Sequence, residues 1–458
     1  MKSTFIYPLI YLLIFVISCS GDHSFPGYPD RSSDLDVLPG FRNPPPGYGE
    51  VPFWWWTGDT LSSERLIHQI TELHKKGISG VQVNYSHLDS PGWLTDESYP
   101  GIFTEEWWNI YSQISRECAK NGMGIGLSTY TLDWPRGARN LFYRLFYHDM
   151  ALNAFEIRHL IRGRYKGGEN ISITLASDSL NLVTNSWAES SNYKVMPERI
   201  AVYAYPVQDN MIKTDGTDLQ GYIASGRLKW NVPDGEWEVW EYQSVRRPGT
   251  LNPLLAGSGD TLITRFFQQF EDRAGSSEGL NYFFNDELHV GAGKFAWNQD
   301  FAQEFKDRKG YDLFRFLPAM WIDVGNITPK VRMDYADVRM ALMEERYFIP
   351  IYKWHESRGM IFGCDSESRG LDPSEFGDYF RATRWYTAPG HDTPGGKADL
   401  IKGKVSSSIA NLYQRPRVWL EGYHSLGWGA APEQLMKATL ENFLYGCTLL
   451  NLHGLYYT

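Results

Sequence analysis

The chain has 458 residues, of which 42% are hydrophobic, enough for one large domain with an insertion or for two domains. Its formal net charge of −10 argues against nucleic acid as a partner. Four widely spaced cysteines match neither a zinc site nor a disulfide framework. Aromatic residues make up 15% of the chain, which suits stacking on sugar rings as well as the filling of a large core.

The first 20 residues are expected to be a lipoprotein signal peptide. Lys2 precedes an apolar run over 6–17 that is too short to span a membrane comfortably. Val16-Ile-Ser-Cys19 resembles a bacterial lipobox, so we predict lipidation of Cys19 and a location in the bacterial cell envelope, at the outer membrane or in the periplasm. The alternative is an ordinary secretory signal with a chance cysteine. Residues 21–48, rich in Pro, Gly, Asp and Ser, are expected to form a linker.

Residues 49–150 alternate between strand and helix patterns at a regular pitch. Apolar strand-like runs occur at about 51–56, 78–85 and 123–129. Helical patterns lie between them, and Ser62 or Ser63 and Thr104 are the residues that begin these helices. Such β-α-β-α-β order predicts a parallel sheet.

The pattern changes over residues 151–250, where short alternating runs predict an inserted antiparallel β-sandwich. The α/β pattern resumes over 251–458, with a long helix at 332–358 and a weaker strand candidate at 379–388. Expected strands near 51, 79, 123, 280, 360, 380, 417 and 447 make eight in total. Eight β/α units predict a (β/α)₈ TIM barrel in the α/β class, interrupted by the sandwich.

Acidic residues follow several of these apolar runs directly. Leu280–Phe284 is followed by Asp286 and Glu287, and the run that begins at Val418 ends at Glu421. An unpaired buried charge costs several kcal/mol, so we expect these acids where the strands leave the sheet, at the carboxyl ends that carry active sites in parallel folds. The residues expected at this rim are Asp59, Asp133, Asp286, Glu287, His289, Asp365, Glu367, His391, Asp392, Glu421, His424 and His453.

Several carboxyl groups around an aromatic rim suit glycoside hydrolysis, which needs one acid to protonate the leaving oxygen and a second carboxylate to activate water or attack. Crowded carboxylates also raise one another's pKa values. Among the tryptophans, Trp134, Trp385, Trp419 and Trp428 are expected to contact sugar. The predicted carbohydrate-binding residues are Asp59, Asp133, Trp134, Asp286, His289, Glu367, Asp392, His424, Trp428 and His453.

Four segments carry a resemblance to a known family. Pro52-Phe-Trp-Trp-Trp-Thr-Gly-Asp59, Gly77-Ile-Ser-Gly-Val-Gln-Val83, Phe283-Phe-Asn-Asp-Glu287 and Val418-Trp-Leu-Glu421 resemble the corresponding segments of glycoside hydrolase family 106, the α-L-rhamnosidases. The resemblance runs from about residue 50 to the end of the chain. It implies a (β/α)₈ barrel with an inserted sandwich, exo-hydrolysis of α-L-rhamnosides of plant or pectic glycans with inversion, and a calcium ion near the sugar.

By this resemblance, Glu287 on the fourth strand is the general acid and Glu421 on the seventh is the general base. Asp286 is the alternative acid if Glu287 instead forms a salt bridge. Family members show Asp-x-x-Glu on the fourth strand, whereas here the two acids are adjacent and His289 stands three residues beyond Asp286. The choice of acid and any calcium ligand from that spacing therefore stay open, and the sequence shows no compact metal-binding loop.

Members of that family continue past the barrel into β-rich domains, whereas this sequence stops just after the eighth expected strand. We expect either a truncated product or a second polypeptide that covers this strand. A second hypothesis is accordingly a non-catalytic, glycan-binding surface lipoprotein. The acids and histidines of the rim argue against it, because binding alone needs mainly aromatic and neutral hydrogen-bonding groups.

Overall fold

The computed structural model describes residues 48–84, 99–128, 149–185, 190–274, 279–285, 293–365, 378–427 and 429–457. All of them belong to one compact unit that begins at Pro46. Cys19 and the predicted signal peptide lie outside the described residues. No helix in these ranges has the length and apolar character needed to cross a membrane.

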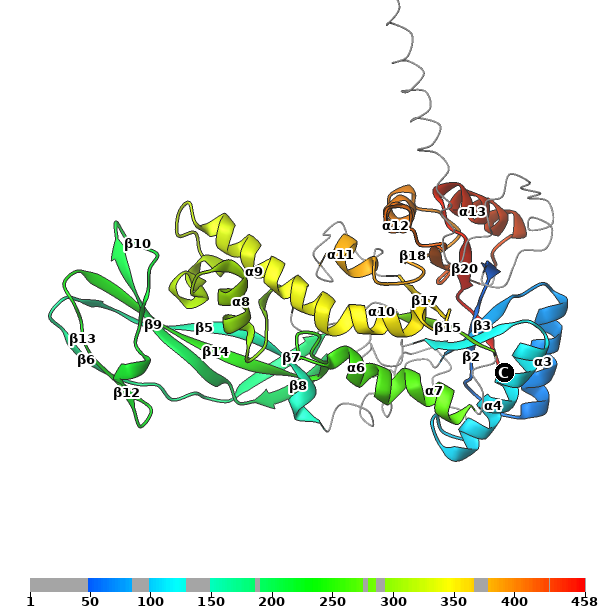
Figure 1. Ribbon diagram of the computed structural model, residues 1–458, viewed down its shortest axis with the longest axis horizontal. Coiled ribbons are helices and arrows are strands. Elements are labelled where there is room, and N and C mark those ends of the chain that lie inside the picture. The colour runs from blue at the N-terminus through cyan, green and yellow to red at the C-terminus, as the bar shows by residue number, and fades with distance from the viewer. Residues whose placement is uncertain are drawn as a thin grey trace, which may run out of the picture. The chain divides into compact units, whose positions relative to one another are not determined.

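Short parallel strands form a curled sheet (Figure 1). Helices separate many of these strands along the chain, and the strands follow the order expected from the sequence. The strands of this sheet are β1 (Gly49–Glu50), β2 (Phe53–Trp55), β3 (Gly80–Asn84), β4 (Gly124–Ser128), β15 (Leu280–Asn285), β17 (Ile361–Cys364), β18 (Gly390–Thr393), β19 (Trp419–Gly422), β20 (Leu449–Leu452) and β21 (Leu455–Tyr456).

The pairing of these strands explains the curl. Strands β2, β3, β4, β15 and β17 pair in succession, and every pair is parallel. Strands β18, β19 and β20 form a second parallel series, and β20 pairs with β1. A parallel bridge between Gly363 and Ala388 joins the two series. Because β1 and β2 are successive parts of the segment 49–55, the pairing leads around the sheet and back to its first strand segment.

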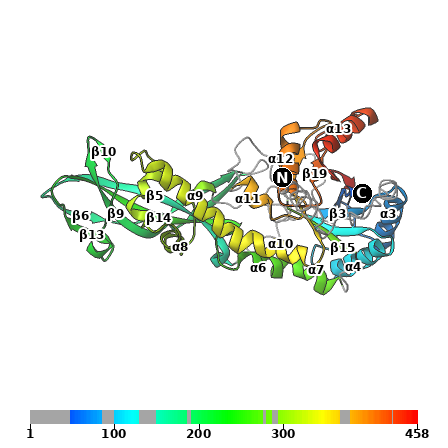
Figure 2. The same cartoon turned by 45° about the horizontal axis from the view of Figure 1, so that its top comes forward.

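Helices cover the outer side of this sheet. Ser62 and Thr104 cap the first two helices as predicted, accepting hydrogen bonds from Arg65 N and Trp107 N. Figure 2 shows these two helices beside β3 at one edge and α12 and α13 beside β19. The helices are α3 (Ser63–Lys75), α4 (Glu105–Lys120), α6 (Ser258–Leu262), α7 (Gln268–Arg273), α8 (Phe301–Lys309), α9 (Thr328–Met343), α10 (Ile349–Glu356), α11 (Tyr379–Thr383), α12 (Leu400–Leu412) and α13 (Pro432–Tyr445), with π-helical η4 (Ile263–Phe267) and η8 (Glu344–Phe348).

Two large aromatic side chains fill the inside of the curl above glycines. A Cβ on Gly80 or Gly124 would lie 2.3 or 2.2 Å from the Tyr282 ring. A Cβ on Gly363 would lie 2.3 Å from the Trp419 ring. Glycine on one strand thus makes room for an aromatic side chain on another, which gives a packed interior rather than a channel.

Antiparallel strands follow β4 in the chain, and all those given below except β16 precede α6. One sheet pairs β14 with β5 and β9, and a second pairs β13 with β6 and β12. A buried apolar cluster contains Val202 and Val239 from the first sheet and Leu228 and Trp230 from the second. The strands are β5 (Asn153–Lys166), β6 (Asn170–Thr174), β7 (Leu180–Asn185), β8 (Ser190–Val195), β9 (Glu198–Gln208), β10 (Met211–Ile212), β11 (Thr217–Asp218), β12 (Ile223–Ala224), β13 (Arg227–Asn231), β14 (Glu236–Leu251) and β16 (Ala296–Trp297), with short 3₁₀ turns η2 (Met150–Leu152), η3 (Gln220–Tyr222), η5 (Gly293–Phe295), η6 (Leu313–Arg315) and η7 (Leu317–Met320).

The structure corrects the position of the sixth strand. Residues 379–388 were expected to form it, but Tyr379–Thr383 is helical and begins at Asp378, whose side chain accepts a hydrogen bond from Arg381 N. The strand is β18, whose sequence Gly-His-Asp-Thr has no apolar run. It pairs with β19, and glycine at 390 allows the neighbouring strands to approach closely, because a Cβ there would lie 2.4 Å from Cys364 O and Trp419 O and 2.5 Å from Trp419 Cβ.

The predicted long helix at 332–358 is also interrupted. Pro350 has no N–H to donate to the carbonyl of Arg346, four residues earlier, and the helix widens into the π-helical η8 at this point. The Ser258 hydroxyl donates to that carbonyl over 3.1 Å. A Cβ on Gly259 would lie 2.7 Å from Tyr347 O, so glycine allows α6 to approach the interrupted helix closely.

Candidate active site

Three polar residues lie side by side at the carboxyl ends of neighbouring strands. Asp392 on β18 pairs in register with Glu421 on β19, which pairs with Asn451 on β20. Residues two positions apart in a strand face the same side, so Glu421 and Asn451 share a face with Trp419 and Leu449. Those two apolar residues belong to the cluster inside the curled sheet. The three polar side chains therefore lie on the inner face, above the packed interior.

Two histidines and a lysine surround the two carboxylates. Glu421 Oε1 lies 3.9 Å from His424 Nδ1 and 3.8 Å from His453 Nε2. Asp392 Oδ2 lies 3.5 Å from His424 Nε2, and Asp392 Oδ1 lies 3.1 Å from Lys402 Nζ. Glu421 is only 5% exposed. Burial of a carboxylate is costly unless charged or hydrogen-bonding groups surround it. Lys402 is a cation beside Asp392, and the two histidine rings place a positive charge beside Glu421 when they are protonated.

Neighbouring residues hold this cluster in place. Asn451 Nδ2 donates to Val51 O over 2.5 Å. The His453 ring packs between Phe53 and Trp55, at centroid distances of 5.4 and 5.3 Å. The His453 ring is thus held by Phe53 and Trp55, and its Nε2 atom faces Glu421.

Sequence reasoning missed three residues of this region. Asn451 could have been found from the alternation Leu449, Asn451, His453 on the last strand. Tyr456 is half-buried and stacks on Trp55 at 6.2 Å and 16°. It lies on the two-residue strand β21, which is too short to show a strand pattern in the sequence. Lys402 comes from the first turn of α12, and no feature of the sequence links it to Asp392.

The structure brings four predicted site residues together: Asp392, Glu421, His424 and His453. Asp59 makes a different contact, since its carboxylate is 72% exposed and lies 3.5 Å from Arg65 Nη1. Asp365 is buried directly after β17. By strand alternation it shares a face with Ile361 and Gly363, and this is the inner face of the sheet. The remaining predictions lie outside the described residues, namely Asp133, Trp134, Asp286, Glu287, His289, Glu367 and Trp428.

His391 does not belong to the inner face, which corrects the expectation that it lies at the rim. It alternates with Asp392 and faces α12, where its Nδ1 lies 3.0 Å from Ser406 Oγ. Burial lowers the pKa of this histidine to about 4. A neutral, buried imidazole bonded to a helix is a structural group.

Two tryptophans that were expected to contact sugar have other partners. Trp419 is fully buried and stacks on Phe284 at 5.0 Å, so it forms the floor beneath Glu421. Trp385 donates its Nε1–H to Glu344 Oε1 over 2.9 Å. Both positions have a structural explanation, because a tryptophan at the end of a strand or helix can lie against the core as easily as it can line a binding site.

Across the described ranges, no three His, Cys, Asp or Glu side chains are arranged to hold a metal ion. Asp286 and His289, whose spacing the resemblance would use for a calcium ligand, lie outside these ranges.

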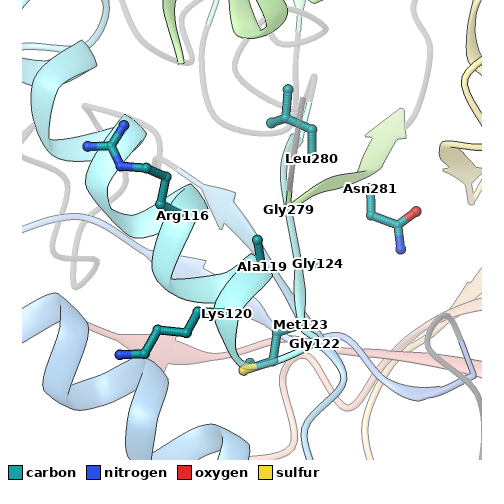
Figure 3. A pocket seen from close by; sticks show the side chains of 9 residues that line it. All are labelled: Arg116, Ala119, Lys120, Gly122, Met123, Gly124, Gly279, Leu280 and Asn281. Carbon is teal, nitrogen blue, oxygen red and sulfur yellow. The ribbon is translucent and has the colours of Figure 1, made fainter. Parts of the chain in front are cut away.

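A pocket of about 670 Å³ lies at the opposite edge of the sheet (Figure 3). It is bounded by the amino ends of β4 and β15, at Gly124 and Leu280, and by Arg116 and Lys120 of α4. The cluster around Glu421 lies at carboxyl ends, so this pocket is separate from it. None of the predicted site residues lines it.

Comparisons with known proteins show which proteins this chain resembles in fold and in sequence. No protein-family model matches the chain. A rhamnosidase from Novosphingobium sp. PP1Y has a similar structure, with a TM-score of 0.68 and 12% identity over 92% of this chain and 56% of that one. A curated protein from Formosa agariphila, named a putative beta-glucuronidase, is 21% identical over 98% of this chain and 40% of its own length.

These similarities define the fold and leave the reaction open. The chain shares the fold of that rhamnosidase over most of its own length. It spans roughly half the length of the two proteins, 56% of one and 40% of the other. Whatever these whole proteins act on is therefore a proposal for this chain.

Proposed function

We propose that this chain is a glycoside hydrolase that acts on α-L-rhamnosides of plant or pectic glycans with inversion. The observation that carries the proposal is Glu421, a buried carboxylate that faces two histidines at the carboxyl end of a parallel strand. That position suits a catalytic group in parallel α/β folds. The rhamnoside is supported by the sequence resemblance and by the fold shared with a rhamnosidase.

In the proposed mechanism, Glu421 is the general base. Its carboxylate accepts a proton from the attacking water, and the nearby His424 and His453 stabilise the ionised form that a base requires. Glu287, which lies outside the described residues, is the proposed general acid. Inversion needs the two carboxyl groups about 6.5–9.5 Å apart, which leaves room for the water between them.

The proposed architecture is a (β/α)₈ barrel over 49–150 and 251–458, with a β-sandwich inserted at 151–250. The curled parallel sheet and the antiparallel strands between β4 and α6 support this division. The proposed role of Asp392 and His453, which lie beside His424, is to line the sugar-binding site.

The location is likewise a proposal. A signal peptide over 1–20, lipidation of Cys19 and a linker over 21–48 would tether the enzyme in the bacterial cell envelope. Labelling of the bacterium with a fatty-acid analogue tests this. Label on the wild type and none on Cys19→Ala supports the anchor, and equal label on both rejects it.

Hydrolysis of a panel of aryl glycosides by the purified chain tests the function. We expect release from aryl α-L-rhamnoside, with the first product of inverted configuration by NMR. The panel includes aryl β-D-glucuronide because the curated relative is named a putative beta-glucuronidase. Release from this substrate alone would support a glycoside hydrolase and reject rhamnose as its sugar. Binding of rhamnosides without turnover of any glycoside would favour the non-catalytic alternative. Calorimetric titration with Ca²⁺ tests the calcium ion implied by the resemblance.

A further inference from the structure

The turn that follows β19 has an unfavourable backbone conformation. Tyr423 and Ser425, the two neighbours of His424, have φ angles of +71° and +61°. Side chains other than glycine rarely adopt this left-handed region, and such residues persist only where surrounding contacts impose them. Non-glycine residues with left-handed φ angles concentrate at functional sites, and His424 lies between two of them.

Contacts from neighbouring segments impose this conformation. Gly395 N donates to His424 O over 2.7 Å, and Tyr423 N donates to Thr393 O over 3.3 Å. The Tyr423 hydroxyl is hydrogen-bonded to Thr439 Oγ1 on α13. The chain after β18 and the helix after β19 therefore both fix the turn that carries His424.

The turn places one imidazole ring between two carboxylates. His424 Nε2 lies 3.5 Å from Asp392 Oδ2, and His424 Nδ1 lies 3.9 Å from Glu421 Oε1. The two acids pair in register on adjacent strands, where two like charges destabilise each other. A protonated ring between them attracts both.

We propose that His424 is a positioning residue that bridges Asp392 and Glu421 as an imidazolium and holds the Glu421 carboxylate ionised and oriented. The catalytic consequence rests on the proposed function of Glu421, whereas the bridge itself does not. This role differs from direct contact with the sugar, the role that the sequence suggested for this histidine.

The charged groups around the ring favour this role. Glu421 faces it from β19 and Asp392 from β18. Lys402 of α12 lies on the other oxygen of Asp392, and the His453 ring after β20 is 5.6 Å from the His424 ring. Lys402 contacts Asp392 and the His453 ring faces Glu421, whereas the His424 ring lies close to both acids.

NMR titration of the histidine rings tests the bridge without any need for catalysis. The chain has 11 histidines, and loss of a signal in His424→Gln identifies the one that matters. We expect the titration midpoint of this ring to move to lower pH by about one unit or more in both Asp392→Asn and Glu421→Gln, the size expected for loss of an opposite charge at this distance. The exposed His68 on α3 serves as the reference that should not move. An unchanged His424 midpoint in either variant overturns the bridge.

Kinetics on the hydrolysed glycoside separates positioning from sugar binding. His424→Gln should lower kcat at least tenfold with KM within twofold, and free imidazole should restore part of the activity of His424→Ala. In the Asp392→Asn background the same substitution should cost at least threefold less, because the bridge is already broken. A raised KM with unchanged kcat would instead make His424 a sugar ligand and overturn the proposal. An inactive wild type would reject the proposed function, and the NMR result would still decide the bridge.

Discussion

Asp392 and Glu421 lie side by side on neighbouring parallel strands, paired in register on the inner face of the curled sheet. Lys402 lies beside Asp392, the His453 ring faces Glu421, and the ring of His424 lies between the two carboxylates. A site with this distribution of charge can keep a carboxylate ionised in a buried position.

The ion pair between Lys402 and Asp392 should stabilise the fold. Lys402→Met leaves Asp392, which is 16% exposed at its side chain, without this cation. We expect a loss of about 1–2 kcal/mol in the free energy of unfolding, between the values for surface and buried pairs. Lys437→Met is the matched control, because Lys437 is 77% exposed and lies 3.9 Å from Glu441. Denaturant unfolding measures both, and equal small effects would show that the Lys402 pair contributes no more than a surface pair.

Packing of Trp419 over Gly363 predicts a cost for any larger residue there. A Cβ at Gly363 would lie 2.3 Å from the indole ring, so Gly363→Ala should destabilise the fold by about 1–3 kcal/mol. Gly221→Ala is the control, since a Cβ there has no heavy atom within 4 Å. The free energies of unfolding of the two variants test this. Similar values for both would contradict the packing described for the interior.

The buried His391 should make stability depend on pH. Its pKa is lowered from 6.5 to about 4 by burial, so the unfolded chain binds one more proton between these pH values. Its contribution to stability therefore falls as the pH drops from about 6.5 to about 4, by up to about 1.4 kcal/mol per pH unit. In His391→Asn, which keeps a side chain able to bond Ser406, the slope of unfolding free energy against pH should be shallower by about this amount. The exposed His68→Asn should leave the slope unchanged, and a slope unchanged in His391→Asn would show that the ring is protonated in the folded state.

The choice between Glu287 and Asp286 as general acid can be made with leaving groups. Without its general acid, the enzyme hydrolyses a substrate at a rate that depends strongly on the leaving group, because a good leaving group departs without being protonated. Glu287→Gln should therefore lose about 10²–10⁴-fold in kcat on an alkyl rhamnoside and much less on a dinitrophenyl rhamnoside. Asp286→Asn should show no such difference between the substrates. The reverse result would assign the acid to Asp286.

The sequence predicts much of the sheet because most of its strands are apolar runs. Leu280–Asn285 and Leu449–Leu452 are strands where they were expected, and Glu421, His424 and His453 follow such runs. Strand β18 was not predicted because its sequence, Gly-His-Asp-Thr, has a polar residue on each face. His391 is hydrogen-bonded to Ser406, and Asp392 faces Lys402. Such a strand is stabilised by partners from elsewhere in the chain, which periodicity does not reveal.

The same reason explains the errors in the candidate site. His391 and Asp392 are adjacent in sequence, yet strand alternation turns one towards α12 and the other towards Glu421. The strand was expected at 379–388, so the sequence did not show that His391 and Asp392 lie on a strand and face opposite sides of it. Trp419 was expected to contact sugar because it stands two residues before Glu421, but the glycine at 363 makes room for it below the site.

The proposed role of Glu421 as the catalytic base can be tested by the kcat of Glu421→Gln on aryl α-L-rhamnoside. Glutamine keeps the shape of the side chain and removes its ability to accept a proton. We predict a fall in kcat of about 10²–10⁴-fold with an unchanged circular dichroism spectrum, while Glu433→Gln on the exposed first turn of α13 retains full activity. Full activity of a folded Glu421→Gln would contradict the account.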